Sequence, residues 1–164
     1  MKKILATILA LVLAIGVTTM AWATETAAEK VAKVGETEYA TLQEAVNAAD
    51  GKTVQLLQDV TASITIESGK TVTLDLNGKT LTNEDGQHTI TNNGTLTIVD
   101  TSAAKSGTVD NVTHAKGAIV NYGVTVLNGG TFERSQEKGT YSPYGNGGNS
   151  WYTIANYGKM EINA

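Results

Sequence analysis

A short phrase that occurs three times constrains the fold of this 164-residue chain more than any single residue does. In each copy an apolar strand end leads into Asn-x-Gly, and two apolar positions spaced by two residues follow. The copies are residues 90–98, 119–127 and 154–162. One turn therefore joins two strands at the same place in every copy. Repetition of such a unit predicts a stacked, solenoid-like β architecture.

Composition indicates a chain that has many turns and little helix. The sequence contains 17 Gly, one Pro and no Cys, so no disulfide supports the fold. Its formal net charge is −4, and no stretch is strongly basic. Nucleic acid is therefore not an expected partner.

The N-terminal segment has the pattern of a secretory signal. Lys2 and Lys3 precede an apolar run over residues 4–17, and Ala21-Trp22-Ala23 supplies small residues for cleavage. The run of about 14 residues is shorter than the roughly 20 that a membrane-spanning helix needs. We therefore predict a signal peptide over 1–23, with a retained membrane anchor as the alternative. The mature protein is expected to be secreted or associated with the cell wall or surface, without a membrane segment.

The mature chain is expected to start with a loose leader and one helix. Residues 24–34 are polar and Ala-rich, which predicts a flexible leader. Thr41 and Glu44 then form a capping box, and the apolar stripe over 42–49 ends before Gly51. This helix is expected to cover the apolar end of the first coil, since solenoids need such caps.

From Thr53 onward the apolar pattern has a period of two, which is typical of strands. Aligning the repeated phrase gives three short strands per coil and about four to five coils over residues 35–164. The clearest strands are 72–76, 80–81 and 89–90, then 96–99, 107–109 and 118–120, then 124–127, 131–132 and 152–155. Extra residues must leave the coil as loops, of which 133–150 is the largest.

Polar residues recur at two places in the repeat and predict side-chain ladders along the stack. Asn and Asp tolerate left-handed backbone and form local hydrogen bonds, which suits sharp corners. One expected ladder follows the first strand of each coil and consists of Asn77, Asp100, Asn128 and Asn163. The other lies in the repeated turn and consists of Asn92, Asn121 and Asn156. Tyr122 and Tyr157 share a repeat position and are expected to stack on the outer surface.

Aromatic residues gather in or beside the long loop. They are Tyr141, Tyr144, Trp151 and Tyr152, in a Gly-rich stretch that also contains Asn146 and Asn149. Aromatic faces can stack on sugar rings while amides bond sugar hydroxyls, so these four residues are candidate ligand-binding residues. Alternatively, the rings pack on the coil surface and fix the loop.

No catalytic or metal-binding arrangement is predicted from these residues. Asp75 should point outward between two leucines, but its counterparts in later coils are not acidic, so no carboxylate pair forms. Arg134 is the single arginine, and His88 and His114 have no regular spacing. We therefore expect no metal and no cofactor, and we lean against an enzyme.

With three-strand coils, Asn ladders and an N-terminal helix, the chain resembles the right-handed parallel β-helix proteins of the pectate-lyase-like class. The stretch 34–81, which contains the phrase Asp-Leu-Asn-Gly-Lys-Thr-Leu at 75–81, resembles adhesin-like surface proteins of Gram-positive-type gut bacteria. This resemblance covers about residues 34–164. It implies the fold, while the class includes lyases, hydrolases and plain binding surfaces.

The last strand expected, 159–162, would begin a coil whose other strands are missing. An uncovered solenoid end exposes strand edges, so further coils are expected beyond Ala164, in a longer protein. The expected function is that of a non-enzymatic surface segment, adhesive or stalk-like, which binds extracellular glycans or a host surface protein. The alternative is that these are the N-terminal coils of a polysaccharide lyase or glycoside hydrolase whose catalytic coils are missing.

Overall fold

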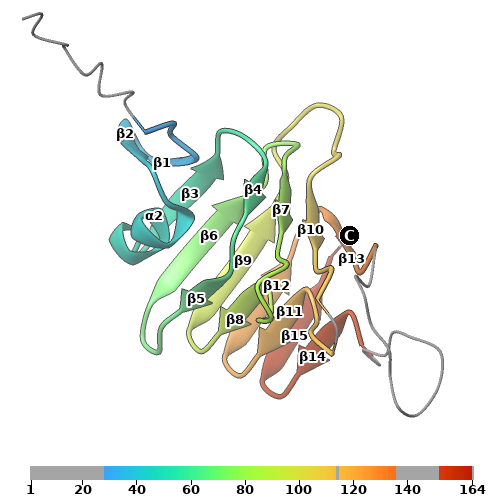
Figure 1. The fold of residues 1–164 in the computed structure, drawn as a ribbon. Coiled ribbons are helices and arrows are strands. Elements are labelled where there is room, and N and C mark those ends of the chain that lie inside the picture. The colour runs from blue at the N-terminus through green and yellow to red at the C-terminus, as the bar shows by residue number, and fades with distance from the viewer. Residues whose placement is uncertain (1–27, 114, 136–151, 164) are drawn as a thin grey trace, which may run out of the picture.

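The computed structural model describes residues 28–113, 115–135 and 152–163 and consists mainly of short β-strands stacked on one another (Figure 1). The helix is α2 (Leu42–Ala48). The first strands are β1 (Ala32–Val34), β2 (Thr37–Tyr39), β3 (Lys52–Leu56), β4 (Val60–Thr61), β5 (Ile64–Ile66), β6 (Thr71–Asp75), β7 (Thr80–Thr82) and β8 (Ile90–Asn92). The remaining strands are β9 (Thr95–Val99), β10 (Thr108–Asp110), β11 (Ile119–Asn121), β12 (Val124–Leu127), β13 (Thr131–Glu133), β14 (Ile154–Asn156) and β15 (Lys159–Ile162).

Strands three apart in the chain pair with one another, which builds three sheets from the described residues. The seven-stranded sheet has the order β15-β12-β9-β6-β3-β1-β2, and the four-stranded sheets have the orders β13-β10-β7-β4 and β14-β11-β8-β5. From β3 to β15 every pairing is parallel. The chain thus visits the three sheets in turn and returns one strand further along. The prediction of an all-β fold with stacked parallel strands and one helix is confirmed, and it is compatible with a β-helix.

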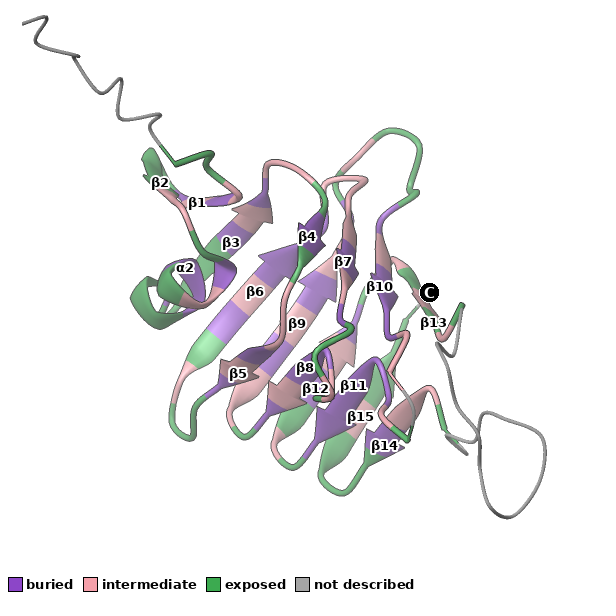
Figure 2. Ribbon diagram, in the orientation of Figure 1, coloured by how far each residue is buried: buried purple, intermediate pink, exposed green. Residues whose placement is uncertain are grey.

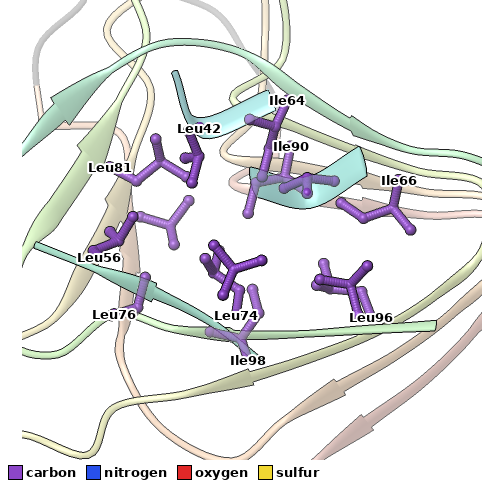
Figure 3. Close-up of a cluster of buried hydrophobic side chains, with 14 of the residues drawn as sticks. Leu42, Leu56, Ile64, Ile66, Leu74, Leu76, Leu81, Ile90, Leu96 and Ile98 are labelled. Carbon is purple, nitrogen blue, oxygen red and sulfur yellow. The ribbon is translucent and has the colours of Figure 1, made fainter. Parts of the chain in front are cut away.

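Alternation along each strand places one set of side chains in a shared core. In β9, Leu96 and Ile98 are fully buried, and the residues between and beside them are half-buried (Figure 2). Leu74 of β6 pairs with Ile98 and lies in the same cluster (Figure 3). Each such Leu or Ile contributes about 1.5–3 kcal/mol through burial. Parallel register therefore aligns like side chains in rows along the stack.

The predicted capping helix forms at the N-terminal end of the stack. Thr41 is the N-cap, and its Oγ1 accepts a hydrogen bond from the Glu44 amide at 3.3 Å. Leu42, Ala45 and Val46 are buried, and the helix packs against β5, β1 and β2 (Figure 1). No helix among the described residues has the length and apolar content needed to cross a membrane.

A hairpin begins the described fold and corrects the predicted boundary of the leader. Residues 32–34, assigned to the flexible leader of 24–34, form β1, which pairs antiparallel with both β2 and β3. Ala32 is fully buried and Val34 is 8 % exposed. Because these two residues alternate with a lysine over only three positions, the apolar pattern is too short to indicate a strand from sequence. The signal peptide predicted over 1–23 lies outside the described residues.

Candidate functional site

The ladder in the repeated turn is built from side-chain amides that bond along the stack. Asn92 Nδ2 donates to Asn121 Oδ1 at 2.9 Å, and Asn121 Nδ2 donates to Asn156 Oδ1 at 2.7 Å. In each copy Oδ1 also accepts from the glycine amide two residues later, at 3.0–3.3 Å. Asn92 and Asn121 are fully buried. Asn at this position thus closes its own turn and joins neighbouring turns.

The corner residues do not form the single four-membered row that the sequence suggested. Asn128 and Asn163 follow paired residues, and Asn163 Nδ2 donates to Asn128 Oδ1 at 2.9 Å. Their row continues through Val99 and Asp75. Asp100 and Asn77 lie one and two residues further along the corner, since the coils differ in where the chain bends.

Asp75 lies on the outer face of the corner, opposite Leu74, but side chains of neighbouring coils cover it and leave it almost buried. Gln55 Nε2 and Thr101 Oγ1 donate to its Oδ2 at 2.8 and 2.6 Å, and the backbone amides of Asn77 and Thr101 donate to its Oδ1 at 3.0 Å each. These neighbours leave the residue 2 % exposed. Burial raises the pKa of Asp75, but the hydrogen bonds outweigh burial and lower the pKa below its ordinary value.

Asp100 is held in the same way by backbone amides of three segments. The amides of Gly78 and Ser102 donate to its Oδ1 at 2.9 and 3.0 Å, and the Gly107 amide donates to Oδ2 at 2.6 Å. Burial raises the pKa of Asp100, and these donors more than compensate, so its pKa is lowered. Asp110 likewise accepts hydrogen bonds from the amide and the hydroxyl of Ser135.

These carboxylates are engaged in holding the corners and loops together. Asp75, Asp100 and Asp110 lie in separate hydrogen-bond networks, each filled by donors of the chain itself. Over residues 28–113, 115–135 and 152–163, no group of three or more His, Cys, Asp or Glu side chains could hold a metal ion. The hydrogen bonds of these three carboxylates serve the structure of the stack.

We expect acid to destabilise the stack through Asp75 and Asp100. A carboxyl whose pKa is lowered on folding stabilises the fold above the pKa of the unfolded chain, at about 4, and this contribution is lost as pH falls through the folded pKa. Urea midpoints at pH 7, 5, 3 and 2 should therefore fall steeply below about pH 4. The variant Asp75→Asn should be less stable at pH 7 and should show a shallower fall in acid. An unchanged slope would contradict this.

Of the four aromatic residues that are candidates for ligand binding, the structure describes Tyr152. Tyr141, Tyr144 and Trp151 lie outside the described part of the chain. The ring of Tyr152 stacks on His88, with a centroid distance of 6.4 Å and an interplanar angle of 22°, and it lies close to Gly117. Tyr152 is 36 % exposed, so part of its surface stays open to solvent.

His88, which contacts Tyr152, and Arg134 both form hydrogen bonds to the backbone of residues 113–117. His88 Nδ1 accepts from the Gly117 amide at 2.9 Å, while burial and then the nearby charge of Lys116 lower the pKa of His88. Arg134 donates from Nε to the Lys116 carbonyl at 2.7 Å and from Nη2 to the Thr113 carbonyl at 3.1 Å. The single arginine therefore holds a turn, which sequence reasoning did not foresee.

Among the residues that the structure describes, the most exposed aromatic pair is Tyr122 and Tyr157. Their rings stack with a centroid distance of 5.3 Å and an interplanar angle of 12°, as their shared repeat position predicted. Tyr122 is 57 % exposed and Tyr157 is 68 % exposed. The stack presents ring surface and two hydroxyl groups to solvent, on the turns beside the Asn ladder.

A hollow of about 560 Å³ lies beside these turns and has no counterpart in the sequence predictions. It is lined by residues 124–126 of β12, by Asn156 and by residues 158–161 at the start of β15. Its lining combines apolar side chains with Lys159 and Glu161. Since the hollow depends on how the last strands lie together, no local sequence pattern indicates it.

The described residues thus offer a rigid stack of hydrogen-bonded ladders, an exposed tyrosine pair and a hollow at the last strand. The chain matches no protein-family model, no curated protein and no solved structure.

Proposed function

We propose that the chain is an exported, non-enzymatic segment of a cell-surface protein, with a right-handed parallel β-helix fold of the pectate-lyase-like type. In this proposal it acts as a stalk or as an adhesive surface for extracellular glycans or a host surface protein.

One observation carries the proposal: the polar side chains that could do chemistry bond along the stack instead. Asp75 accepts four hydrogen bonds from its own chain. The side-chain amides of Asn92 and Asn121 each donate a hydrogen bond to the asparagine of the next turn. Such axial bonding favours a stiff spacer, whose outer surface is free to bind a partner.

The adhesive form of the proposal gains support from the exposed rings. Tyr122 and Tyr157 present a stacked pair to solvent, and aromatic faces with polar handles are suited to sugar rings. Tyr141, Tyr144 and Trp151 remain candidates for the same role in the long loop. A stalk, in contrast, needs none of these rings for contact with a ligand.

A glycan array probed with the purified chain tests the proposal. An adhesive surface should bind particular glycans, and either the triple variant Tyr141→Ala/Tyr144→Ala/Trp151→Ala or the double variant Tyr122→Ala/Tyr157→Ala should lose that binding. A stalk should bind none of them, with or without the substitutions. Release of unsaturated or hydrolysed sugar products from polysaccharides would overturn the non-enzymatic assignment.

A further inference from the structure

We propose that Asn128 is a site of spontaneous modification, at which water converts the asparagine to aspartate and isoaspartate. Asn128 and Gly129 lie at the corner between β12 and β13. An asparagine that precedes glycine is open to this reaction, because glycine has no side chain to hinder attack by its own backbone nitrogen. This inference goes beyond the proposed function and does not depend on it.

The reaction uses only the two residues and water. The backbone nitrogen of Gly129 loses its proton and attacks Cγ of Asn128, so that a new C–N bond forms and the Cγ–Nδ2 bond breaks. The proton and the Nδ2 group leave together as ammonia, and a succinimide ring remains. Water then opens the ring at Cγ to give aspartate, or at the backbone carbonyl to give isoaspartate. In total, one amide and one water become one carboxyl group and one ammonia.

Hydrogen bonds distinguish this Asn-Gly pair from the others in the chain. The sequence contains four such pairs, at 77–78, 93–94, 128–129 and 146–147, and the last lies outside the described residues. The reaction is slowed where the glycine amide donates to an acceptor, or where the leaving Nδ2 group is held, because each such bond must open first. The three described pairs differ in both respects.

The pair at 77–78 is held at the glycine amide and at Nδ2. Asn77 Nδ2 donates to the Leu56 carbonyl at 2.9 Å, and the Gly78 amide donates to Asp100 Oδ1 at 2.9 Å. The second bond is the stronger one, because its acceptor is a carboxylate. The fold therefore protects Asn77 from modification.

The pair at 93–94 is held at the glycine amide. That amide donates to Asn92 Oδ1 at 3.0 Å as part of the turn ladder. The side chain of Asn93 is exposed and forms no hydrogen bond with a described residue. Asn93 is therefore protected in part.

In the pair at 128–129, no described residue holds either the glycine amide or Nδ2. Asn128 is exposed, and its side chain makes one hydrogen bond, in which Asn163 Nδ2 donates to Oδ1 at 2.9 Å. Negative charge develops on Oδ1 while Cγ is attacked, and a donor already placed there favours the reaction. The fold therefore leaves the reacting atoms of this pair accessible to each other.

Coils on both sides flank this corner. The Asn128 amide donates to Ile98 O at 2.8 Å in the preceding coil, and the Asn163 amide of the following coil donates to Leu127 O at 2.8 Å. The backbone at Asn128 is thus fixed by the stack, while its side chain stays exposed. The selectivity for Asn128 is a property of the folded chain, because an unfolded chain lacks these contacts.

Peptide mapping by mass spectrometry, on the folded chain and on the chain unfolded in urea, tests the proposal over a time course at neutral pH. Trypsin releases the three pairs separately, in peptides 71–79, 80–105 and 117–134. In urea the three pairs should react at similar rates. In the folded chain Asn128 should react at close to its unfolded rate. Asn93 should be slowed on the order of 10-fold and Asn77 on the order of 100-fold, since one and two hydrogen bonds must open.

Protection of Asn128 as strong as that of Asn77 would overturn the proposal, and so would equal rates at all three pairs in the folded chain. Asn128→Gln identifies the residue, because peptide 117–134 also contains Asn121. The longer glutamine side chain does not form the succinimide, so this peptide should stay unmodified while circular dichroism shows the variant folded. If the variant peptide still gains a carboxyl group at the original rate, the reaction does not occur at Asn128.

Discussion

Replacement of Gly123 by alanine is expected to lower the free energy of unfolding by about 3 kcal/mol. A Cβ at this position would lie 2.0 Å from the carbonyl oxygen of Gly94, in the neighbouring turn. The obstacle is backbone, which cannot rotate away as a side chain can, and the two turns are held by the hydrogen bond from the Val124 amide to that same oxygen at 2.8 Å. The strain must therefore separate the stacked turns. Urea unfolding followed by circular dichroism measures the change.

Gly69 supplies the matched control. It also lies in a turn of the stack, but a Cβ there meets nothing within 4 Å, and its φ of +82° adds only backbone strain. Gly69→Ala should therefore cost about 1 kcal/mol, the penalty for an L-residue in left-handed backbone. Equal losses for the two variants would mean that conformational strain, and not the close approach of stacked turns, explains the glycine of the repeat.

That distinction shows what the repeated phrase could predict. Asn-x-Gly with flanking apolar residues was sufficient to place the turn, the two strands and the stacking of Asn92, Asn121 and Asn156. The usual reason for a turn glycine, a positive φ, does not hold for the glycines of the phrase. They are needed because parallel turns lie directly on one another, which is a property of the stack and not of one turn.

Residue type alone does not predict which corner residues align, because the coils bend at different positions. At the corner, residue type groups Asn77 and Asp100 with Asn128, whereas strand pairing groups Asp75 and Val99 with Asn128. The Leu76 amide donates to Val99 O at 2.9 Å, so the earlier coil stays extended for another residue before it turns. Register is set by hydrogen bonds between coils, and these cannot be read from one coil at a time.

Burial of polar side chains was equally hard to predict. Alternation correctly placed Asp75 on the face opposite Leu74, but the side chains of Gln55 and Thr101 from neighbouring coils cover it. The same holds for the contact of Tyr152 with His88, which are far apart in sequence. A single sequence shows which residue types recur, whereas contacts across the stack depend on loop lengths.

Asn121 is the centre of the turn ladder, and Asn121→Leu is expected to cost about 3–5 kcal/mol, the upper range for a buried hydrogen-bond network. The side chain is fully buried, accepts from Asn92 Nδ2 at 2.9 Å, and donates to Asn156 Oδ1 at 2.7 Å and to the Lys159 carbonyl at 2.9 Å. Leucine has a similar volume, so the loss measures unsatisfied polar groups rather than a cavity. The free energy of unfolding in urea gives the value, and Asn93→Leu, at an exposed position in the adjacent turn, should change it by less than about 1 kcal/mol.

A second substitution separates donor loss from loss of the side chain as a whole. In Asn121→Asp a charged carboxylate could still accept from Asn92, but it would oppose Asn156 Oδ1 and the Lys159 carbonyl, which both need a donor. Burial beside these oxygens should raise the pKa of the new carboxyl above its unfolded value of about 4. Its penalty should therefore be complete at pH 7 and should shrink as pH falls and the carboxyl gains a proton that it can donate. If Asn121→Asp instead loses stability in acid as steeply as the unchanged chain, the amide donor of Asn121 does not hold the turns together.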